Sequence, residues 1–237
     1  MISVRTKLYF SMENLILQQF FVFTFSERHD KMCSYLYFSF LRGQTMDSNF
    51  FALISRMRYI ARWGLMRNAL PENIQEHSHM VAVLAHALGV IRRDIFHQPC
   101  DVNALATAAL YHDASEILTG DLPTPIKYHN AEIMSAYHAV EDLAVQKLLG
   151  MLPPELRETY ADVLAEDKDG DIYPLVKAAD KLSAYIKCIE ERKAGNNEFL
   201  SAEAQTRAAL EASPLPEVQY FLEHFIPAFE RDLDELG

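Results

Sequence analysis

A histidine and an aspartate stand side by side at His112 and Asp113, near the end of an alanine-rich helical pattern, and Glu116 follows one turn later. Residues four apart share a helix face, so this pattern predicts that His112 and Glu116 point the same way, with Asp113 beside Glu116. An imidazole and a carboxylate can hold a metal ion, and a further carboxylate can transfer a proton. The trio therefore predicts a hydrolytic metal site, and its alternative is a polar helix end that faces water.

A second helical pattern, residues 73–93, contributes a histidine. It begins with Asn73 as N-cap and Glu76 three residues later, a capping-box pair, and it carries His77. His79 faces away from His77 because two positions separate them on the helix, so both cannot join one site. Since a single histidine on a helix is more often satisfied or exposed than a ligand, this pattern decides nothing without partners.

A third pattern, residues 175–188, places Asp180 among small side chains. Such an aspartate is either paired with Lys177 or Lys181 or is itself a metal ligand. The three patterns together offer two imidazoles and two carboxylates: His77, His112, Asp113 and Asp180. This set suits Mn²⁺, Co²⁺, Fe²⁺, Zn²⁺ or Mg²⁺, and the ligand types alone do not choose among them.

Helical periodicity also predicts the elements that must position these side chains. After residue 46 no segment alternates convincingly as a strand, which favours an all-α fold in one compact domain. The expected helices cover residues 50–62, 73–93, 104–118, 132–151, a short segment from 153, 175–188, a segment from 196 and a last one from 214 to 234. Between two of them, Pro123 and Pro125 stiffen a loop that can hold Asp121 and Thr124 near a helix end.

Residues 1–45 differ from the rest of the chain. They are aromatic-rich and irregular in period, and they carry a charge of +2 (5 Lys and Arg against 3 Asp and Glu), whereas residues 46–237 carry −13 (17 against 30). Met46 then opens a stretch that resembles a protein's own beginning. We expect translation to start at Met46, with residues 1–45 a mis-annotated or poorly ordered extension and residues 46–237 the functional domain.

The charge and the cysteine content of the chain indicate which partners and which cellular compartment to expect. The net charge of −11 argues against a protein that binds a nucleic-acid backbone. The three cysteines, Cys33, Cys100 and Cys188, are far apart and odd in number, which indicates a reducing cytoplasm rather than a disulfide framework. No run approaches the roughly eighteen apolar residues of a membrane span.

The order His77, His112-Asp113 and Asp180 resembles that of the HD-domain superfamily of metal-dependent phosphohydrolases. Longer motifs resemble the bacterial 5'-deoxynucleotidases (YfbR-like) of that superfamily, and they span residues 62–68, 76–78, 111–116, 119–125 and 195–199. The match extends from Met46 to about Glu235. It implies an HD-domain helical bundle, a homodimer, and hydrolysis of deoxyribonucleoside 5'-monophosphates to deoxynucleoside and phosphate by attack of a metal-activated water.

The resemblance also implies roles for single residues. The metal ligands, for one divalent ion per subunit, would be His77, His112, Asp113 and Asp180. Co²⁺ or Mn²⁺ is the first expectation, and Zn²⁺, Mg²⁺ or Fe²⁺ is compatible with the set. Arg62 would orient the phosphate and act in catalysis together with Glu116, the carboxylate needed for turnover. Substrate contacts would come from Arg62, Trp63, Asp113, Asp121, Leu122, Pro123, Thr124 and Asp180.

Two other readings stay open. Another HD phosphohydrolase could act on nucleoside triphosphates, signalling nucleotides or cyclic dinucleotides, although the GYP signature of the cyclic-dinucleotide enzymes is absent and few basic residues accompany Arg62 and Arg67. A non-catalytic nucleotide sensor could use the same scaffold, but binding alone does not require Glu116. Glu116 could either activate the attacking water or protonate the leaving 5'-oxygen.

Overall fold

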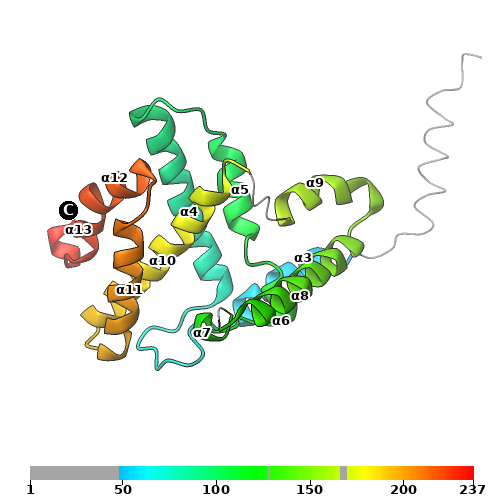
Figure 1. Ribbon diagram of the computed structural model, residues 1–237, viewed down its shortest axis with the longest axis horizontal. Helices are drawn as coiled ribbons and strands as arrows, with labels where there is room; N and C mark the ends of the chain where they lie inside the picture. The colour runs from blue at the N-terminus through cyan, green and yellow to red at the C-terminus, as the bar shows by residue number, and fades with distance from the viewer. Residues whose placement is uncertain (1–47, 128, 166–169) are drawn as a thin grey trace, which may run out of the picture. The chain divides into compact units, whose positions relative to one another are not determined.

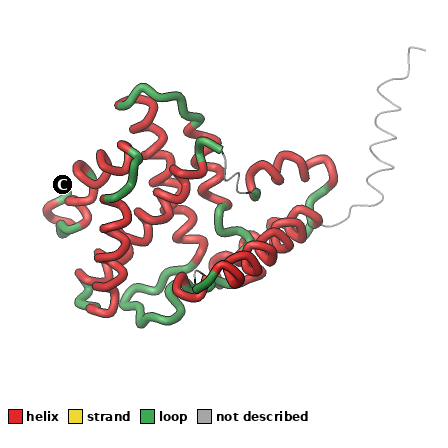
Figure 2. The backbone as a smooth tube through the Cα atoms, viewed as in Figure 1, coloured by secondary structure: helices red, strands yellow, loops and turns green. Residues whose placement is uncertain are grey.

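The computed structural model describes residues 48–127, 129–165 and 170–237, so the predicted extension and the start at Met46 lie outside the described residues. Helices joined by loops build this part of the chain (Figure 2). Its one strand-like pairing is an isolated antiparallel bridge between Ala61 and Asn73. The predicted all-α fold is confirmed. None of the described helices has the length and apolar character that a membrane crossing requires.

The described helices and helical turns are α3 (Phe50–Ile54), η2 (Ser55–Tyr59), α4 (Ile74–Val90), η3 (Ile91–Ile95), α5 (Val102–Tyr111), α6 (Glu116–Thr119), α7 (Thr124–Lys127), α8 (Ala131–Gly150), α9 (Pro154–Leu164), α10 (Tyr173–Lys193), η4 (Asn197–Phe199), α11 (Leu200–Glu211), α12 (Pro216–His224), α13 (Ile226–Phe229) and η5 (Leu233–Glu235) (Figure 1). The capping box of Asn73 and Glu76 is present as predicted. The single closing helix to residue 234 is wrong, because Pro227 lacks a backbone N–H and its ring excludes a continuing helix.

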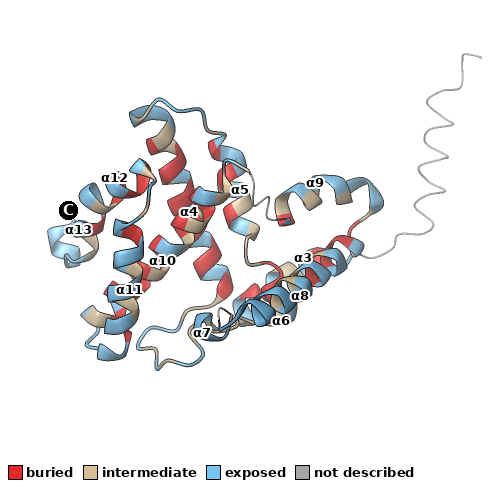
Figure 3. Ribbon diagram, in the orientation of Figure 1, coloured by how far each residue is buried: buried red, intermediate tan, exposed pale blue. Residues whose placement is uncertain are grey.

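The main hydrophobic core lies where α10 packs against α4, α5 and α11. Buried residues concentrate on the facing sides of these helices (Figure 3). A second, smaller core joins α3, α8 and α9 around Phe50 and Leu148. Ala109 belongs to the first core and Ala114 to the second, so the chain between them is held from both sides. His112 and Asp113 lie in this short connection.

The predicted continuous helix over residues 104–118 is wrong at residues 112–115, which include His112 and Asp113. Helix α5 ends at Tyr111, and α6 begins only at Glu116. Between them the backbone turns more tightly, with the Ala114 N–H donating to Tyr111 O at 2.9 Å and the Glu116 N–H to Asp113 O at 3.0 Å. Ala109 and Ala114 pack into different cores on either side of this turn, which favours a break here. The turn lets the adjacent residues His112 and Asp113 approach one site, whereas a straight helix would keep them about 100° apart around its axis.

Candidate metal centre and substrate site

The four side chains predicted as metal ligands converge from three parts of the fold. His77 comes from α4, Asp180 from α10, and His112 and Asp113 from the turn after α5. His77 Nε2 lies 3.1 Å from Asp180 Oδ1 and 3.5 Å from Asp113 Oδ2, and His112 Nε2 lies 3.2 Å from Asp113 Oδ2. Ligand atoms of His77, His112 and Asp180 all fall within 4.8 Å of one another. This spacing fits a single ion between His77, His112 and Asp180, with Asp113 next to both histidines.

Both imidazole rings are oriented by hydrogen bonds on the side away from the carboxylates. His112 Nδ1 donates to Ala109 O at 2.7 Å, which fixes the proton on that nitrogen, and His77 Nδ1 pairs with Ser183 Oγ at 3.1 Å. The opposite nitrogens, Nε2 of both rings, are buried and make no hydrogen bond of normal geometry within the described part of the chain. Buried polar atoms are rarely left this way. An imidazole held at one nitrogen with the other free is the usual arrangement around a metal ion, so the residues fit one.

Burial and neighbouring charges shift the pKa values of His112, Asp113 and Asp180. Burial alone would lower the pKa of His112, but the neighbouring charge of Asp113 outweighs it and raises that pKa to about 9. Burial would raise the pKa of Asp113 and Asp180, yet the histidines beside them hold both pKa values below the ordinary range. The two carboxylates are therefore charged, which concentrates negative charge where a cation would lie.

Arg62 and Trp63 border this centre through a shared glutamate. Arg62 Nη1 donates to Asp113 Oδ2 at 3.3 Å, and its Nε donates to Glu72 Oε2 at 3.1 Å. The same Glu72 oxygen accepts from Trp63 Nε1 at 2.9 Å. Trp63 is also tied to the loop after α6, because its backbone N–H donates to Asp121 Oδ2 at 3.3 Å. A guanidinium and an indole are thus fixed together next to the carboxylate of Asp113.

Trp63 holds an uncommon backbone conformation, with φ of 60°. This left-handed region costs a residue with a side chain about 1–2 kcal/mol, so surrounding contacts must maintain it. Asn68 Nδ2 donates to Trp63 O at 3.5 Å and to Met66 O at 3.1 Å, closing the turn. The indole ring packs at a tilt against Phe199, with ring centroids 5.2 Å apart. The ring is therefore held in place from both its backbone and its face.

A buried carboxylate on α10 anchors the loop that carries Trp63. Glu191 is fully buried and accepts from the N–H groups of Ala69 at 2.8 Å and Leu70 at 3.0 Å, and from Asn196 Nδ2 at 2.8 Å. Lys187 donates both to Glu191 and to Leu70 O. Burial would raise the pKa of Glu191, but these donors outweigh it and lower the pKa to about 2.

Replacing Glu191 with alanine is expected to destabilise the fold by about 3–5 kcal/mol, because Lys187 would be left buried without its counter-charge. The folded-state pKa of about 2 lies below the ordinary 4.5, so this contribution is complete above pH 4.5 and is lost as the pH falls towards 2. Urea unfolding at neutral pH, and at a pH between these two values, should therefore show a difference from wild type that narrows in acid. Glu190→Ala, at the exposed neighbouring position, should cost less than about 0.5 kcal/mol at either pH.

Glu116 begins α6 and is buried near the four predicted ligands. Its Oε1 accepts from Lys127 Nζ at 3.1 Å, and its Oε2 is buried with no hydrogen-bond partner in the described residues. Burial raises the pKa of Glu116 to about 8, with the charge of Asp113 adding to the effect and Lys127 opposing it. A carboxyl group with such a pKa can exchange a proton near neutral pH.

The remaining predicted substrate residues lie along one loop. Gly120 ends α6 with φ of 74°, a value that favours glycine, and Asp121 follows with its contact to Trp63. Leu122 and Pro123 are half-buried in the loop, whereas Thr124 is exposed where α7 begins. The structure therefore brings Asp121 into the hydrogen-bonded group around Trp63 and leaves Thr124 at its margin.

Sequence reasoning missed four residues that orient this site: Glu72, Lys127, Ser183 and Glu191. Ser183 was detectable, because it lies three residues after Asp180 on one helix and shares its face. Glu191 binds the backbone of Ala69 and Leu70, which are distant in sequence, and no local pattern indicates that. Glu72 binds Arg62 and Trp63 at separations of 10 and 9 residues, across a loop in which no periodic pattern predicts contacts. Lys127 belongs to a turn of helix, α7, that the two prolines before it concealed.

The chain is similar to known proteins over most of its length. The family described as 5'-deoxynucleotidase YfbR-like matches residues 49–229. The 5'-deoxynucleotidases YfbR of Shigella boydii serotype 18 and of Escherichia coli (strain K12 / DH10B) are each 50% identical over 192 residues, which is 81% of this chain and 96% of the relative. Among solved structures, an HD-domain phosphohydrolase from Listeria innocua has a TM-score of 0.69 at 24% identity and covers 78% of this chain and 90% of its own. The PH0347 protein of Pyrococcus horikoshii has a TM-score of 0.59 at 21% identity, and the match covers 77% of this chain and 98% of that protein. These two likenesses concern the fold.

Proposed function

This chain belongs to the 5'-deoxynucleotidase YfbR-like family, and we propose from this membership and the site geometry that it is a metal-dependent phosphoric monoester hydrolase acting on deoxyribonucleoside 5'-monophosphates. The observation that carries the proposal is the pair of buried, unbonded Nε2 atoms of His77 and His112, which lie beside the carboxylates of Asp113 and Asp180. The products would be the deoxynucleoside and inorganic phosphate.

His77, His112, Asp113 and Asp180 would hold one divalent ion per subunit. When bound, the ion polarises a phosphoryl oxygen and lowers the pKa of the water that attacks phosphorus. We propose Co²⁺ or Mn²⁺ as that ion, because a mixed set of imidazoles and carboxylates suits borderline and hard divalent cations, and Zn²⁺, Mg²⁺ and Fe²⁺ fit the same ligand types.

Arg62 would bind the phosphate group of the substrate. Its guanidinium is permanently charged and fork-shaped, so it can donate two parallel hydrogen bonds to phosphate oxygens. It already lies 3.3 Å from Asp113, which places a positive charge at the edge of the ligand set. The chain as a whole carries −11, so this local charge offsets the repulsion that a phosphate dianion meets.

Glu116 would transfer the proton. In one direction its Oε2 takes a proton from the attacking water, and in the other it gives a proton to the 5'-oxygen that leaves phosphorus. The buried and otherwise unbonded Oε2 supports either use.

The sugar and base would lie against Trp63 and the loop of Asp121, Leu122, Pro123 and Thr124. Asp113 and Asp180 would also touch the substrate, because they border the phosphate position next to Arg62. We propose that the fixed indole and the Asp121 loop leave no room or partner for a 2'-hydroxyl. Discrimination through a clash or an unpaired polar group can exceed the ~1–3 kcal/mol available from pocket size alone.

Replacing Trp63 with alanine is expected to raise the activity ratio of ribonucleotide to deoxyribonucleotide by about 10–200-fold, because the rigid ring that limits space near the sugar is removed. The kcat/KM values for AMP and dAMP, measured in parallel, give this ratio. Trp63→Phe keeps an aromatic ring at the same position and should change the ratio far less. An unchanged ratio in the alanine variant would contradict the role assigned to the indole.

We also propose that the enzyme is a homodimer in the cytoplasm, with no nucleic-acid or membrane partner. Helix α8 supports the dimer, because Ile133, Val140 and Leu143 are exposed on it. Cys100 and Cys188 are free thiols, which agrees with a reducing compartment. Light scattering of the purified protein would measure the oligomeric state.

A phosphate-release assay tests the proposed function. The purified protein, first stripped of metal, would be supplied with each divalent ion in turn and with deoxyribonucleoside monophosphates, ribonucleoside monophosphates or deoxyribonucleoside triphosphates. We expect metal-dependent release from the deoxyribonucleoside monophosphates and little from the other two classes. Preference for triphosphates, or binding without release, would instead support one of the two alternative readings.

A further inference from the structure

Lys127, the last residue of α7, directs its ammonium group into the protein rather than to solvent. Its side chain is 21% exposed, and Nζ lies 3.1 Å from Glu116 Oε1 and 3.7 Å from Glu141 Oε1. Nζ also lies 4.6 Å from the centre of the Tyr137 ring. Helices α6 and α7 both pack against α8, so α8 supplies one wall around this lysine (Figure 1).

Burying a lysine in this way is unfavourable unless the charge is compensated. A lysine side chain is long and flexible and normally reaches water, so its position here requires specific attraction. The negative charges of Glu116 and Glu141 and the face of the aromatic ring provide that attraction. Since Glu141 is farther away, the shorter contact with Glu116 fixes the direction of the ammonium group.

The two carboxylate oxygens of Glu116 have different surroundings. Lys127 engages Oε1, while Oε2 is buried and has no hydrogen-bond partner among the described residues. The carboxylate of a glutamate can rotate about the Cγ–Cδ bond. A charged hydrogen bond to one of its oxygens restricts that rotation. The free oxygen is then held in one direction.

We propose that Lys127 is a positioning residue of the hydrolytic reaction, which fixes Glu116 through Oε1 so that Oε2 is presented for proton transfer. The inference rests on the proposed function. In the step it serves, one proton passes from the attacking water to Oε2, or from Oε2 to the leaving 5'-oxygen. The contacts of Lys127 Nζ are with Glu116, Glu141 and the Tyr137 ring, so its proposed part is to hold Glu116. A simpler role is also testable, in which Lys127 only ties α7 to α6 and matters for folding.

A double-mutant cycle separates these roles. The variants are Lys127→Met, Glu116→Gln and both together, assayed with Mn²⁺ and dAMP. Misplacing a reacting group costs about 10–100-fold, so we expect Lys127→Met to lower kcat by this factor with KM and Mn²⁺ affinity within about 2-fold of wild type. In the Glu116→Gln background the same change should cost nothing further, because the group it positions is already inactive. Lys127→Arg, which keeps the charge and the donor, should recover part of the rate.

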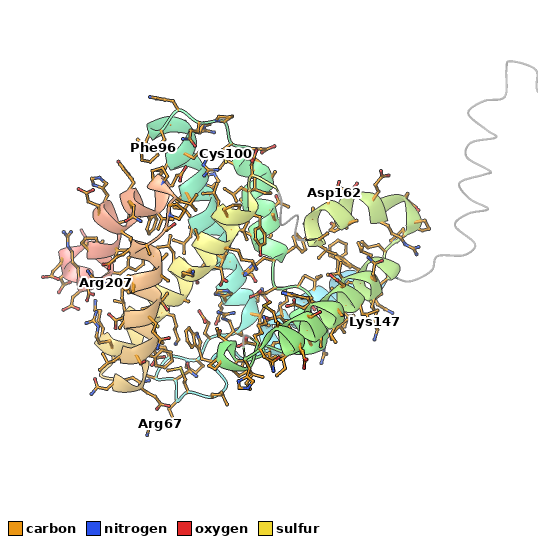
Figure 4. All side chains as sticks on the ribbon, in the orientation of Figure 1. Arg67, Phe96, Cys100, Lys147, Asp162 and Arg207 are labelled. Carbon is orange, nitrogen blue, oxygen red and sulfur yellow. The ribbon has the colours of Figure 1, made fainter. Side chains whose placement is uncertain are left out.

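The exposed Lys147, in the last turns of the same helix α8 that covers Lys127, provides the matched control (Figure 4). Lys147→Met should leave kcat unchanged. Thermal melting of every variant checks folding, and Lys127→Gln replaces the methionine variant if the latter does not fold. Equal losses from Lys127→Met in both backgrounds, or a kcat within 2-fold of wild type, would overturn the inference while leaving the proposed function intact. A wild-type protein that releases no phosphate from dAMP would overturn the proposed function, and the inference with it.

Discussion

Replacing Glu116 with glutamine should lower kcat by about 10²–10⁴-fold, the range that a positioned acid or base contributes. Glutamine keeps the size of the side chain and can still accept from Lys127 Nζ at its amide oxygen. It cannot gain or lose a proton at the other position, where Oε2 is buried without a hydrogen-bond partner in the described structure. The loss should therefore appear in kcat, with KM nearly unchanged.

Metal binding distinguishes this effect from damage to the site. Glu116 is not one of the four proposed ligands, so isothermal titration with Mn²⁺ should give an affinity within a few-fold of wild type. Glu132→Gln, at an exposed position in the first turn of α8, is the matched control and should retain full activity. If Glu116→Gln kept activity within a few-fold of wild type, the proton-transfer role would be wrong.

Replacing His112 with alanine should abolish activity by removing a proposed ligand. Substitutions that only support a metal ligand already cost about 10–100-fold in affinity, and loss of the ligand itself should exceed that. His112 Nε2 is buried next to Asp113 Oδ2, at 3.2 Å, and Nδ1 is held by Ala109 O, so the ring already points Nε2 at the proposed ion position. Titration of the metal-free variant with Mn²⁺ would measure the affinity, and the phosphate-release assay the activity.

His79 supplies the matched control for this second variant. It lies two residues from His77 on α4 but is exposed, so His79→Ala removes an imidazole without touching the centre. It should bind Mn²⁺ and hydrolyse dAMP as wild type does. A His112→Ala protein that bound Mn²⁺ with wild-type affinity would show that the ion lies elsewhere.

The sequence predicted which residues meet, because their chemistry is unusual for the positions they hold. A helix core has no packing use for His112 and Asp113 with Glu116 one turn later, so this group stands out, whereas His77 and Asp180 became informative only in combination with it. The helices that bring these residues together were predictable from the spacing of their apolar residues. The capping pair at Asn73 also follows from residue types alone, since its hydrogen bonds are local.

What the sequence did not predict depends on contacts between distant segments. The break after Tyr111 follows from two cores that hold the chain on either side of the turn, and helical periodicity does not record such a break. On α8 the apolar periodicity was correct, yet Val140 and Leu143 are exposed, because periodicity identifies a face without saying what covers it. The pairing of Lys127 with Glu116 likewise arises only once α7 lies against α8.

The central claim is that His77, His112, Asp113 and Asp180 hold one ion next to Arg62. Crystals of the protein grown with Mn²⁺ and a non-hydrolysable dAMP analogue, measured with X-rays tuned to the manganese absorption edge, test it most directly. The account predicts one anomalous peak per subunit within bonding distance of all four side chains, with the phosphate group of the analogue against Arg62. A peak bound by other residues, or a phosphate group remote from Arg62, would contradict it.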